Sequence, residues 1–436
     1  MRVTIAKPNV FNSYGILLAQ GSIQTVDNTF GQSLVYSLQA TDTDGVLPFA
    51  ANSPFSNSAS VAALAQSGIS NLTPQNTGHV RAAVARVLAG TGICKVACIG
   101  DSIALGAFAN GVVYAGNKPL GYPAQLAKIL TARGLPATND SWFGSGNVAP
   151  ATAAGYTAYN AAVTFPVAGF APGAIAGLGA FAMASTTNGA TLAFTPTIAF
   201  DTIDIYYLGG TGGAFNVNVD GGATLQTITP SGTHLPFVAT ITGVALATHT
   251  INIVTNSATG VFIAGMAVRA SATPRVEVYN CGWSAALVST YAQPTNSTFQ
   301  YNYFVALPAM APDLTVINLT VNDIDQQPTT VVAYQTALQS MIAQALVSGD
   351  CALMVGNPGN KASWTTNPGV AAAYQAAVAN LASAAGIPLI DITQRWTSYA
   401  VTNPVMPYGD PGVTALHPGQ SGHADIAKVI AGLCAA

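Results

Sequence analysis

Charge is the property that this sequence has least of. Only 7% of its 436 residues are Asp, Glu, Lys or Arg, against roughly a quarter in ordinary globular proteins. The formal net charge is −3 and there is no basic patch, which argues against nucleic-acid binding. No apolar run reaches the roughly 18 residues of a spanning helix, so no membrane span is predicted. Ser, Thr, Asn, Gln and Gly must cover the surface, which suits an extracellular or virion-associated protein.

Cysteine pairs and a secretion signal are also missing. The five cysteines are an odd number and show no zinc spacing with His; they are Cys94, Cys98, Cys281, Cys351 and Cys434. Cys94 and Cys98 lie four apart on a predicted strand, too far apart to pair with each other. We therefore expect buried free thiols and no disulfide framework. The start of the chain lacks the basic and apolar regions of a signal peptide, so either this is a mature form or export uses another route.

The pattern of polar and apolar residues changes three times along the chain. Residues 1–88 are rich in small polar residues with short alternating runs, and we interpret them as an N-terminal attachment or extension segment. Residues 89–155 and 272–436 alternate helices with apolar strands, which is typical of a parallel α/β sheet. Residues 156–271 instead carry short alternating segments that end in turn residues, which predicts an all-β sandwich. The sequence therefore predicts an α/β domain with an inserted β-domain.

The stretch "VACIGDSIALG" (96–106) places an acid and a hydroxyl at the exit of a buried strand. In an open α/β sheet, the carboxyl ends of the strands are where sites form. Ser102 would also stand at a helix N-terminus, where backbone N–H groups favour a developing negative charge. The alternative is that Asp101 and Ser102 simply cap the helix.

Three other stretches carry polar groups at comparable places. His417 precedes "PGQSG" and an amphipathic helix, a position that suits a general base. Asn322, in "VINLTVNDID", follows a strand and can donate its amide N–H to an oxyanion. Gly282 ends the strand of "EVYNCGWSA" and would let a backbone N–H approach a substrate. His423 is interpreted as a cap or packing residue. The remaining histidines are taken as surface residues: His79, His234 and His249.

Taken in order, "GDSIALG", a strand ending in Gly282, "TVND" and "HPGQSGHADIA" resemble the SGNH (GDSL) hydrolase superfamily. The resemblance covers residues 89–155 and 272–436. It implies a three-layer α/β/α, flavodoxin-like domain built on a parallel sheet. It also implies a serine ester hydrolase that needs no cofactor and no metal.

The resemblance assigns roles to individual residues. Ser102 would be the nucleophile and His417 the base. The oxyanion hole would be formed by the backbone N–H groups of Ser102 and Gly282 and by the side chain of Asn322. Asp101 would be a structural neighbour of the nucleophile.

Two positions depart from the family pattern. The family usually has Gly where this chain has Thr320. The family's acid lies three residues before the His, and that position is Thr414 here. We favour Asp410 as the acid, reached by a lengthened loop; the alternative is a Ser–His dyad in which Thr414 or a backbone carbonyl orients the ring. Asp391 is expected to be a structural cap.

The insert resembles the jelly-roll modules of some SGNH carbohydrate esterases. This suggests an acylated polysaccharide as substrate, with Tyr206 and Trp364 as candidate substrate-binding aromatics, although core packing is an equal interpretation of Trp364. Another class of function stays open: a non-catalytic glycan-binding, adhesion or phage tail protein attached through residues 1–88. Lipase or thioesterase activity is a third option. Residues 1–88 would also be the place for virion attachment or a homo-oligomer contact.

Overall fold

The computed structural model describes residues 68–144, 150–177, 179–209, 213–231, 236–293, 302–410 and 415–434, together with five short strands before them. The chain divides into two compact units, Met1–Thr73 and Pro74–Ala436. The first unit contains a three-stranded antiparallel sheet in the order β4-β1-β5 and a β2–β3 pair. Its strands are β1 Arg2–Ile5, β2 Val10–Phe11, β3 Leu17–Leu18, β4 Ile23–Thr25 and β5 Ala40–Asp42. Among the described residues, no helix is long and apolar enough to cross a membrane.

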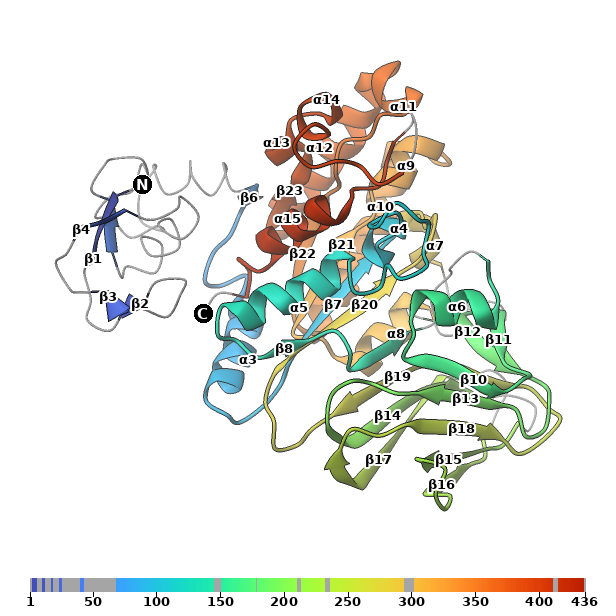
Figure 1. Cartoon of the computed structure of the whole chain (residues 1–436). Helices are drawn as coiled ribbons and strands as arrows, with labels where there is room; N and C mark the ends of the chain where they lie inside the picture. The colour runs from blue at the N-terminus through green and yellow to red at the C-terminus, as the bar shows by residue number, and fades with distance from the viewer. Residues whose placement is uncertain are drawn as a thin grey trace. The chain divides into compact units, whose positions relative to one another are not determined.

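The second unit is built on a parallel sheet whose strands follow the order β23-β22-β21-β7-β20-β8. Helices α3, α5 and α15 cover one face, and α8, α10 and α12 cover the other (Figure 1). This confirms the predicted three-layer α/β/α architecture. The strands of this unit are β7 Cys94–Gly100, β8 Ala137–Thr138, β20 Val276–Gly282, β21 Leu314–Asn318, β22 Asp350–Val355 and β23 Leu389–Asp391; β6 Ile69–Ser70 belongs to the first unit. The helices are α3 Gly78–Leu88, α4 Ser102–Leu105, α5 Tyr122–Ala132, α7 Val288–Tyr291, α8 Tyr303–Met310, α9 Val321–Gln326, α10 Val331–Ser348, α11 Ala362–Thr365, α12 Pro368–Ala385, α13 Ile392–Trp396, α14 Tyr399–Thr402 and α15 Gln420–Ile430.

Helix α3 corrects the predicted boundary at residue 88. Its apolar face is buried through Val80, Ala83, Val84 and Val87. The Asp350 carboxylate accepts a 2.8 Å hydrogen bond from the Val80 N–H, which fixes the start of the helix beside β22. The helix therefore belongs to the α/β domain, where its apolar stripe packs on β7 and β22.

The insert consists of two antiparallel sheets, with strand orders β10-β13-β18-β15-β16 and β11-β12-β19-β14-β17. Residues alternate between buried and exposed along strands such as β18, as expected for sheets with one covered face. Its jelly-roll-like connectivity stays a prediction. The elements are α6 Ala153–Tyr159, β9 Trp142–Gly144, β10 Val163–Val167, β11 Ala171–Gly177, β12 Ala180–Ser185, β13 Thr191–Phe194, β14 Phe200–Leu208, β15 Phe215–Val219, β16 Gln226–Ile228, β17 Pro236–Ala247, β18 Ile251–Thr255 and β19 Val261–Arg269.

The two ends of the insert meet and are packed into the α/β core. Strand β9, which precedes the insert, pairs with β19, which ends it, in the register Met266↔Phe143. Tyr206 lies in this junction at 2% exposure, edge-on to Trp142, whose ring stacks on Tyr279 of β20. Tyr206 is therefore a core residue, and its assignment as a substrate-binding aromatic is wrong. The alternating pattern placed one of two adjacent tyrosines inward and did not show which.

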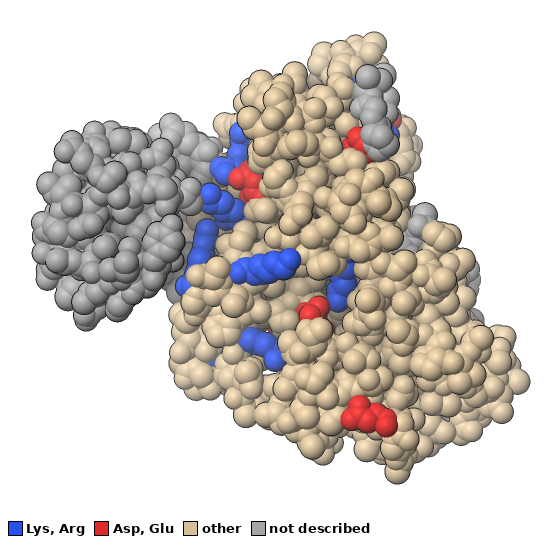
Figure 2. Space-filling model, viewed as in Figure 1, with Lys and Arg blue, Asp and Glu red and all other residues tan. Residues whose placement is uncertain are grey.

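Few charges reach the surface. Figure 2 shows one face of the molecule, on which Lys, Arg, Asp and Glu are scattered among uncharged residues. All five cysteines are free and buried, as predicted. Burial raises the pKa of these thiols, so they stay protonated and pack as small apolar side chains.

Candidate active site

Ser102 stands where strand β7 turns into helix α4. The turn is closed by Asp101, whose Oδ1 accepts a 2.8 Å hydrogen bond from the Ile103 N–H. It is also tight: a Cβ built on Gly100 would lie 2.8 Å from the Ala104 Cβ. No described residue accepts a hydrogen bond from the Ser102 N–H. The nucleophile segment thus presents a hydroxyl and a free backbone donor at the carboxyl edge of the sheet.

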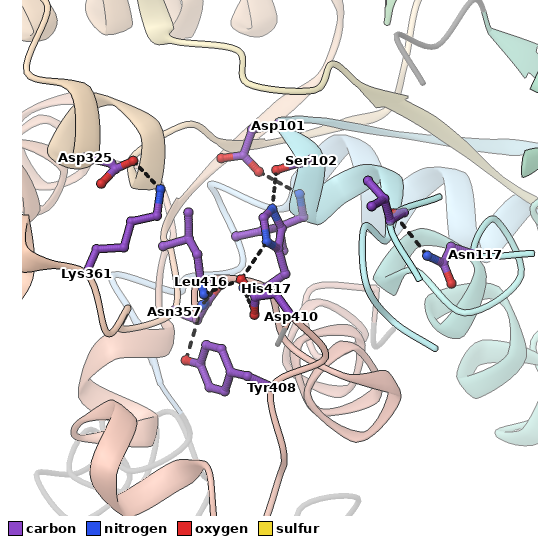
Figure 3. A network of polar contacts seen from close by, with 12 residues as sticks. Asp101, Ser102, Asn117, Asp325, Asn357, Lys361, Tyr408, Asp410, Leu416 and His417 are labelled. Carbon is purple, nitrogen blue, oxygen red and sulfur yellow. Dashed lines mark hydrogen bonds and ion pairs between the residues drawn. The ribbon is translucent and has the colours of Figure 1, made fainter. Parts of the chain in front are cut away.

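Three predicted side chains come together at this edge (Figure 3). Ser102 Oγ lies 2.8 Å from His417 Nε2. On the other side of the ring, His417 Nδ1 lies 3.0 Å from Asp410 Oδ2. The ring of Phe108 packs beside the imidazole at a centroid distance of 5.1 Å. These contacts form the hydroxyl–imidazole–carboxylate chain of a Ser–His–Asp triad.

The loop geometry explains the long spacing between acid and base. Tyr408 and Pro418 form an antiparallel bridge, and the Gly409 N–H donates to the His417 carbonyl at 2.9 Å. The Asp410 carboxylate then accepts backbone N–H bonds from Leu416 at 2.7 Å and from His417 at 3.0 Å. Burial opposes its ionisation, but the hydrogen bonds from His417 and Leu416 outweigh burial and lower the pKa of Asp410. Asp410 is therefore a carboxylate aimed at Nδ1; Thr414 lies outside the described residues.

A second layer of contacts holds the His417 loop against the sheet. Asn357, which follows β22, donates its amide to the Leu416 carbonyl at 2.9 Å. The Tyr408 hydroxyl accepts from the same amide at 3.3 Å and donates to the Pro358 carbonyl. These bonds fix Leu416, the residue just before the base. The His417 ring is thus held by Asp410, and the chain that carries it is held by Asn357.

Trp364 lies on the short helix α11, after the loop that follows β22. Lys361 pairs with Asp325 of α9 at 2.5 Å, and the Ser363 hydroxyl donates to the same carboxylate at 3.1 Å. These bonds hold helix α11, on which Trp364 is half-buried against the α/β core. A Cβ built on Gly359 would lie 3.0 Å from the indole nitrogen of Trp364, so the ring packs against the loop that follows Asn357. The structure places Trp364 near the site, and substrate contact stays a prediction.

Gly282 does not offer the free backbone donor that was expected of it. Its N–H donates at 3.0 Å to Oδ1 of Asn280, whose amide in turn donates to the Ala104 carbonyl at 2.9 Å. The glycine is required for another reason: a Cβ there would lie 2.8 Å from the Leu105 nitrogen and 2.9 Å from the Asp101 carbonyl oxygen. Gly282 therefore allows β20 to approach α4, and its assignment to the oxyanion hole is wrong.

Asn322 links two of the loops at the edge of the sheet. It lies buried at the start of α9, and its amide donates to the Ala286 carbonyl at 3.0 Å. Ala286 belongs to the loop after Gly282, where Ala285 adopts a left-handed conformation with φ 59°. No described residue accepts from the Ala285 N–H. No sequence pattern points to this alanine, because a left-handed residue is expected to be glycine or asparagine.

The remaining candidates have structural positions. Thr320 is buried, and its hydroxyl donates to the Met354 carbonyl at 3.3 Å, so a side chain is accommodated there. Asp391 caps α13 by accepting from the Gln394 N–H at 2.6 Å, the structural role expected of it. His79 is exposed on α3, and His249 pairs with Asp220 in a turn of the insert. His423 is completely buried; His234 lies outside the described residues.

A small, partly open cavity of about 20 Å³ lies between α4 and the insert. Leu105 and Gly282 line it from the α/β domain, and Trp142, Tyr156 and Tyr159 line it from the junction with the insert. Its walls are mainly apolar. Within the described ranges, no group of three His, Cys, Asp or Glu side chains is arranged to hold a metal ion.

One buried carboxyl beside the site gives a test of stability against pH. Burial raises the pKa of Asp323 to about 7, although its Oδ2 accepts from the Val288 N–H at 2.9 Å. The folded chain holds this proton more tightly than the unfolded chain, so stability is lost as the pH rises from about 4 to about 7. Asp323→Asn should remove this loss and gain about 2–4 kcal/mol over the wild type above pH 7, with the difference shrinking toward pH 4. Urea unfolding at pH 4, 6 and 8 measures it; a difference that is constant with pH would contradict the assignment.

Comparison with known proteins agrees with the architecture. Residues 256–424 match the model of the GDSL-like lipase/acylhydrolase family; this range contains Asn322, Asp410 and His417 but not Ser102. The structure of a peptidoglycan O-acetylesterase is similar, with a TM-score of 0.59 at 13% identity, covering 84% of this chain and 97% of that one. An active-site mutant of a family two carbohydrate esterase from Clostridium thermocellum gives a TM-score of 0.28 at 12% identity, covering 58% and 92%. No curated protein matches the chain.

The family match and the shared fold fall on the same part of the molecule. The match spans β19 of the insert and then β20 to the start of α15, the part of the chain that carries Asn322, Asp410 and His417. The structure adds β7 and α4, which bring Ser102 to the same edge of the sheet. The α/β domain of this chain therefore carries the segment that matches the GDSL-like lipase/acylhydrolase family, and its fold is consistent with that of an SGNH (GDSL) hydrolase.

Proposed function

We propose that the chain is a serine ester hydrolase that removes a small acyl group, such as acetyl, from a polysaccharide. One observation carries the reaction class: the unbroken contact from Ser102 Oγ through the His417 ring to the Asp410 carboxylate. A serine is a weak nucleophile until an adjacent base takes its proton, and a base works best when a third group holds its ring. Both conditions are met by the described side chains, because His417 is adjacent to Ser102 and Asp410 holds the His417 ring.

Each residue then has a step in the reaction. Ser102 Oγ attacks the ester carbonyl while His417 Nε2 takes its proton, and Asp410 stabilises the imidazolium that forms. The protonated imidazole gives the proton to the leaving alcohol as the acyl-enzyme forms. Water, deprotonated by the same ring, then attacks the acyl-enzyme, and the ring passes that proton to Ser102 Oγ as the bond to the acyl group breaks and the acid leaves. The Ser102 N–H and the second amide proton of Asn322 are the donors proposed for the oxyanion.

The role of Asn322 predicts a specific kinetic result. Asn322→Ala should lower kcat on the order of 10²-fold with little change in KM, because the amide bonds most strongly where negative charge develops. Steady-state kinetics on p-nitrophenyl acetate measure this. A loss confined to KM would instead make Asn322 a ground-state binding residue. Thermal unfolding of the same variant reports whether the lost bond to Ala286 loosens the fold.

Three features support the choice of substrate. The surface is poor in charge and rich in small polar residues, which suits contact with neutral glycans and an extracellular or virion-associated location. The cavity beside Leu105 and Gly282 is mainly apolar and measures only about 20 Å³, which leaves no room for a long acyl chain there. Peptidoglycan belongs among the substrates to test, because the similar structure is named as a peptidoglycan O-acetylesterase. The role of residues 1–88 as an attachment segment stays a proposal.

The proposal is tested by acetate release from a panel of acetylated polysaccharides, peptidoglycan included, beside a p-nitrophenyl ester series from acetyl to long acyl chains. The expected result is turnover of at least one acetylated glycan and a rate that falls as the acyl chain grows, with Ser102→Ala inactive throughout. Faster hydrolysis of long chains would indicate a lipase or thioesterase. No turnover of any ester by the folded wild type would indicate a non-catalytic glycan-binding protein.

A further inference from the structure

Behind the nucleophile, four buried side chains carry polar atoms that the described residues leave without hydrogen-bond partners. They are Oδ2 of Asp101, the hydroxyl of Tyr122, both amide atoms of Asn318 and both ring nitrogens of His423. None of the four residues is more than 1% exposed. An unsatisfied buried polar group destabilises the folded state, so a fold rarely keeps several of them together without a partner.

These four residues, called here the buried polar cluster, come from four different elements and lie together. The rings of Tyr122, on α5, and His423, on α15, stack at a centroid distance of 6.5 Å. A Cβ built on Gly100 would lie 3.4 Å from the Tyr122 hydroxyl and 3.2 Å from the Asn318 carbonyl oxygen. Gly100 directly precedes Asp101. Burial, with the Asp101 charge adding to it, raises the pKa of Tyr122, and the contact of its hydroxyl with the Asn318 side chain opposes this rise. The cluster therefore lies at the ends of β7 and β21, under the turn that carries Ser102.

The chemistry of the cluster suits water. Asp101 offers an acceptor, Tyr122 a donor, and Asn318 both. Burial lowers the pKa of His423 to about 3, so its ring is neutral and has one donor and one acceptor. Such a mixed set of donors and acceptors is what a buried water, which makes about three hydrogen bonds, requires.

We propose that the buried polar cluster binds ordered water, and that His423 acts through this water as a positioning residue for the Ser102 turn. His423 is on the helix that directly follows the His417 loop, and its backbone N–H donates to the Gly419 carbonyl at 3.1 Å. Water between His423 and Asp101 would tie the segment of the base to the segment of the nucleophile. The Ser102–His417 contact then depends on the water bridge between Asp101 and His423, in which neither Ser102 nor His417 takes part. This inference rests on the proposed esterase activity.

His423→Phe and His423→Gln separate a positioning role from packing. Phenylalanine keeps the ring and removes both nitrogens, whereas glutamine keeps a donor and an acceptor. His423→Phe should lower kcat for p-nitrophenyl acetate about tenfold with KM within twofold, since small misplacements of catalytic groups are costly. His423→Gln should recover most of the loss, and His79→Phe, at an exposed histidine, should behave as wild type. A folded His423→Phe enzyme with wild-type kcat would overturn the positioning role.

A crystal structure of the wild-type protein tests the water directly, even if His423→Phe fails to fold. The expected density is ordered water within hydrogen-bond distance of Asp101 Oδ2 and a ring nitrogen of His423. A direct bond between Asp101 and a ring nitrogen of His423, or a metal ion with anomalous signal, would overturn the proposal. If the wild type hydrolyses no ester, the esterase proposal fails, and the crystal structure still decides whether the cluster holds water.

Discussion

Replacing Ser102 by alanine should reduce ester hydrolysis to background, a loss on the order of 10⁶-fold in kcat by analogy with other serine triads. The hydroxyl is the atom that forms the acyl-enzyme, and among the described residues its only hydrogen bond is the 2.8 Å contact with His417 Nε2. Because so little else depends on this oxygen, the fold should remain intact. Kinetics on p-nitrophenyl acetate, with circular dichroism as the check on folding, measure the effect.

His417→Ala is the matched companion of this variant. Nucleophile and base act as a unit, so the double variant should lose no more activity than either single one. Wild-type-like rates in a folded Ser102→Ala or His417→Ala protein would contradict the mechanism.

Asp410→Asn should lower kcat by roughly 10²–10⁴-fold, because an amide in place of the carboxylate favours the wrong tautomer of the imidazole. The carboxylate accepts from two backbone N–H groups and lies 3.0 Å from His417 Nδ1. An asparagine oxygen can keep one of these contacts and leaves an amide N–H facing Nδ1 or the backbone. KM should change little, since Asp410 does not touch the substrate.

Asp391→Asn is the control for this variant. Asp391 also lies in the C-terminal part of the sheet, but it only caps α13, a role that asparagine fills equally well. It should therefore leave both rate and stability close to wild type. If Asp410→Asn is as active as Asp391→Asn, the enzyme works as a Ser–His dyad.

The sequence carried enough information for the fold class and for the three residues of the triad. An apolar strand running into Asp101 and Ser102 predicts a strand-to-helix turn, and such turns gather at one edge of a parallel sheet. Asp410 was the nearest acid on the correct side of His417, and the bridge between Tyr408 and Pro418 shows how seven residues of chain bring it back. Where only backbone direction and residue type matter, the pattern was sufficient.

The sequence was not sufficient where side chains choose between local partners. The Gly282 N–H is taken by a residue two positions earlier, Asn280, whose side chain folds back along its own strand. Tyr206 and Tyr207 alternate in and out, and only the packing of Trp142 shows that Tyr206 is the inner one. Helix α3 was assigned to the wrong unit, because an apolar stripe shows that a helix packs but not on what.

The central claim is that Ser102 is an activated nucleophile, and active-site labelling tests it most directly. The intact protein is incubated with a fluorophosphonate, and the adduct is located by mass spectrometry of its peptides. We expect one adduct per chain, on Ser102. Asp410→Asn should be labelled more slowly, and His417→Ala and Ser102→Ala should not be labelled. An unlabelled wild-type protein, or an adduct on another residue that persists in Ser102→Ala, would contradict it.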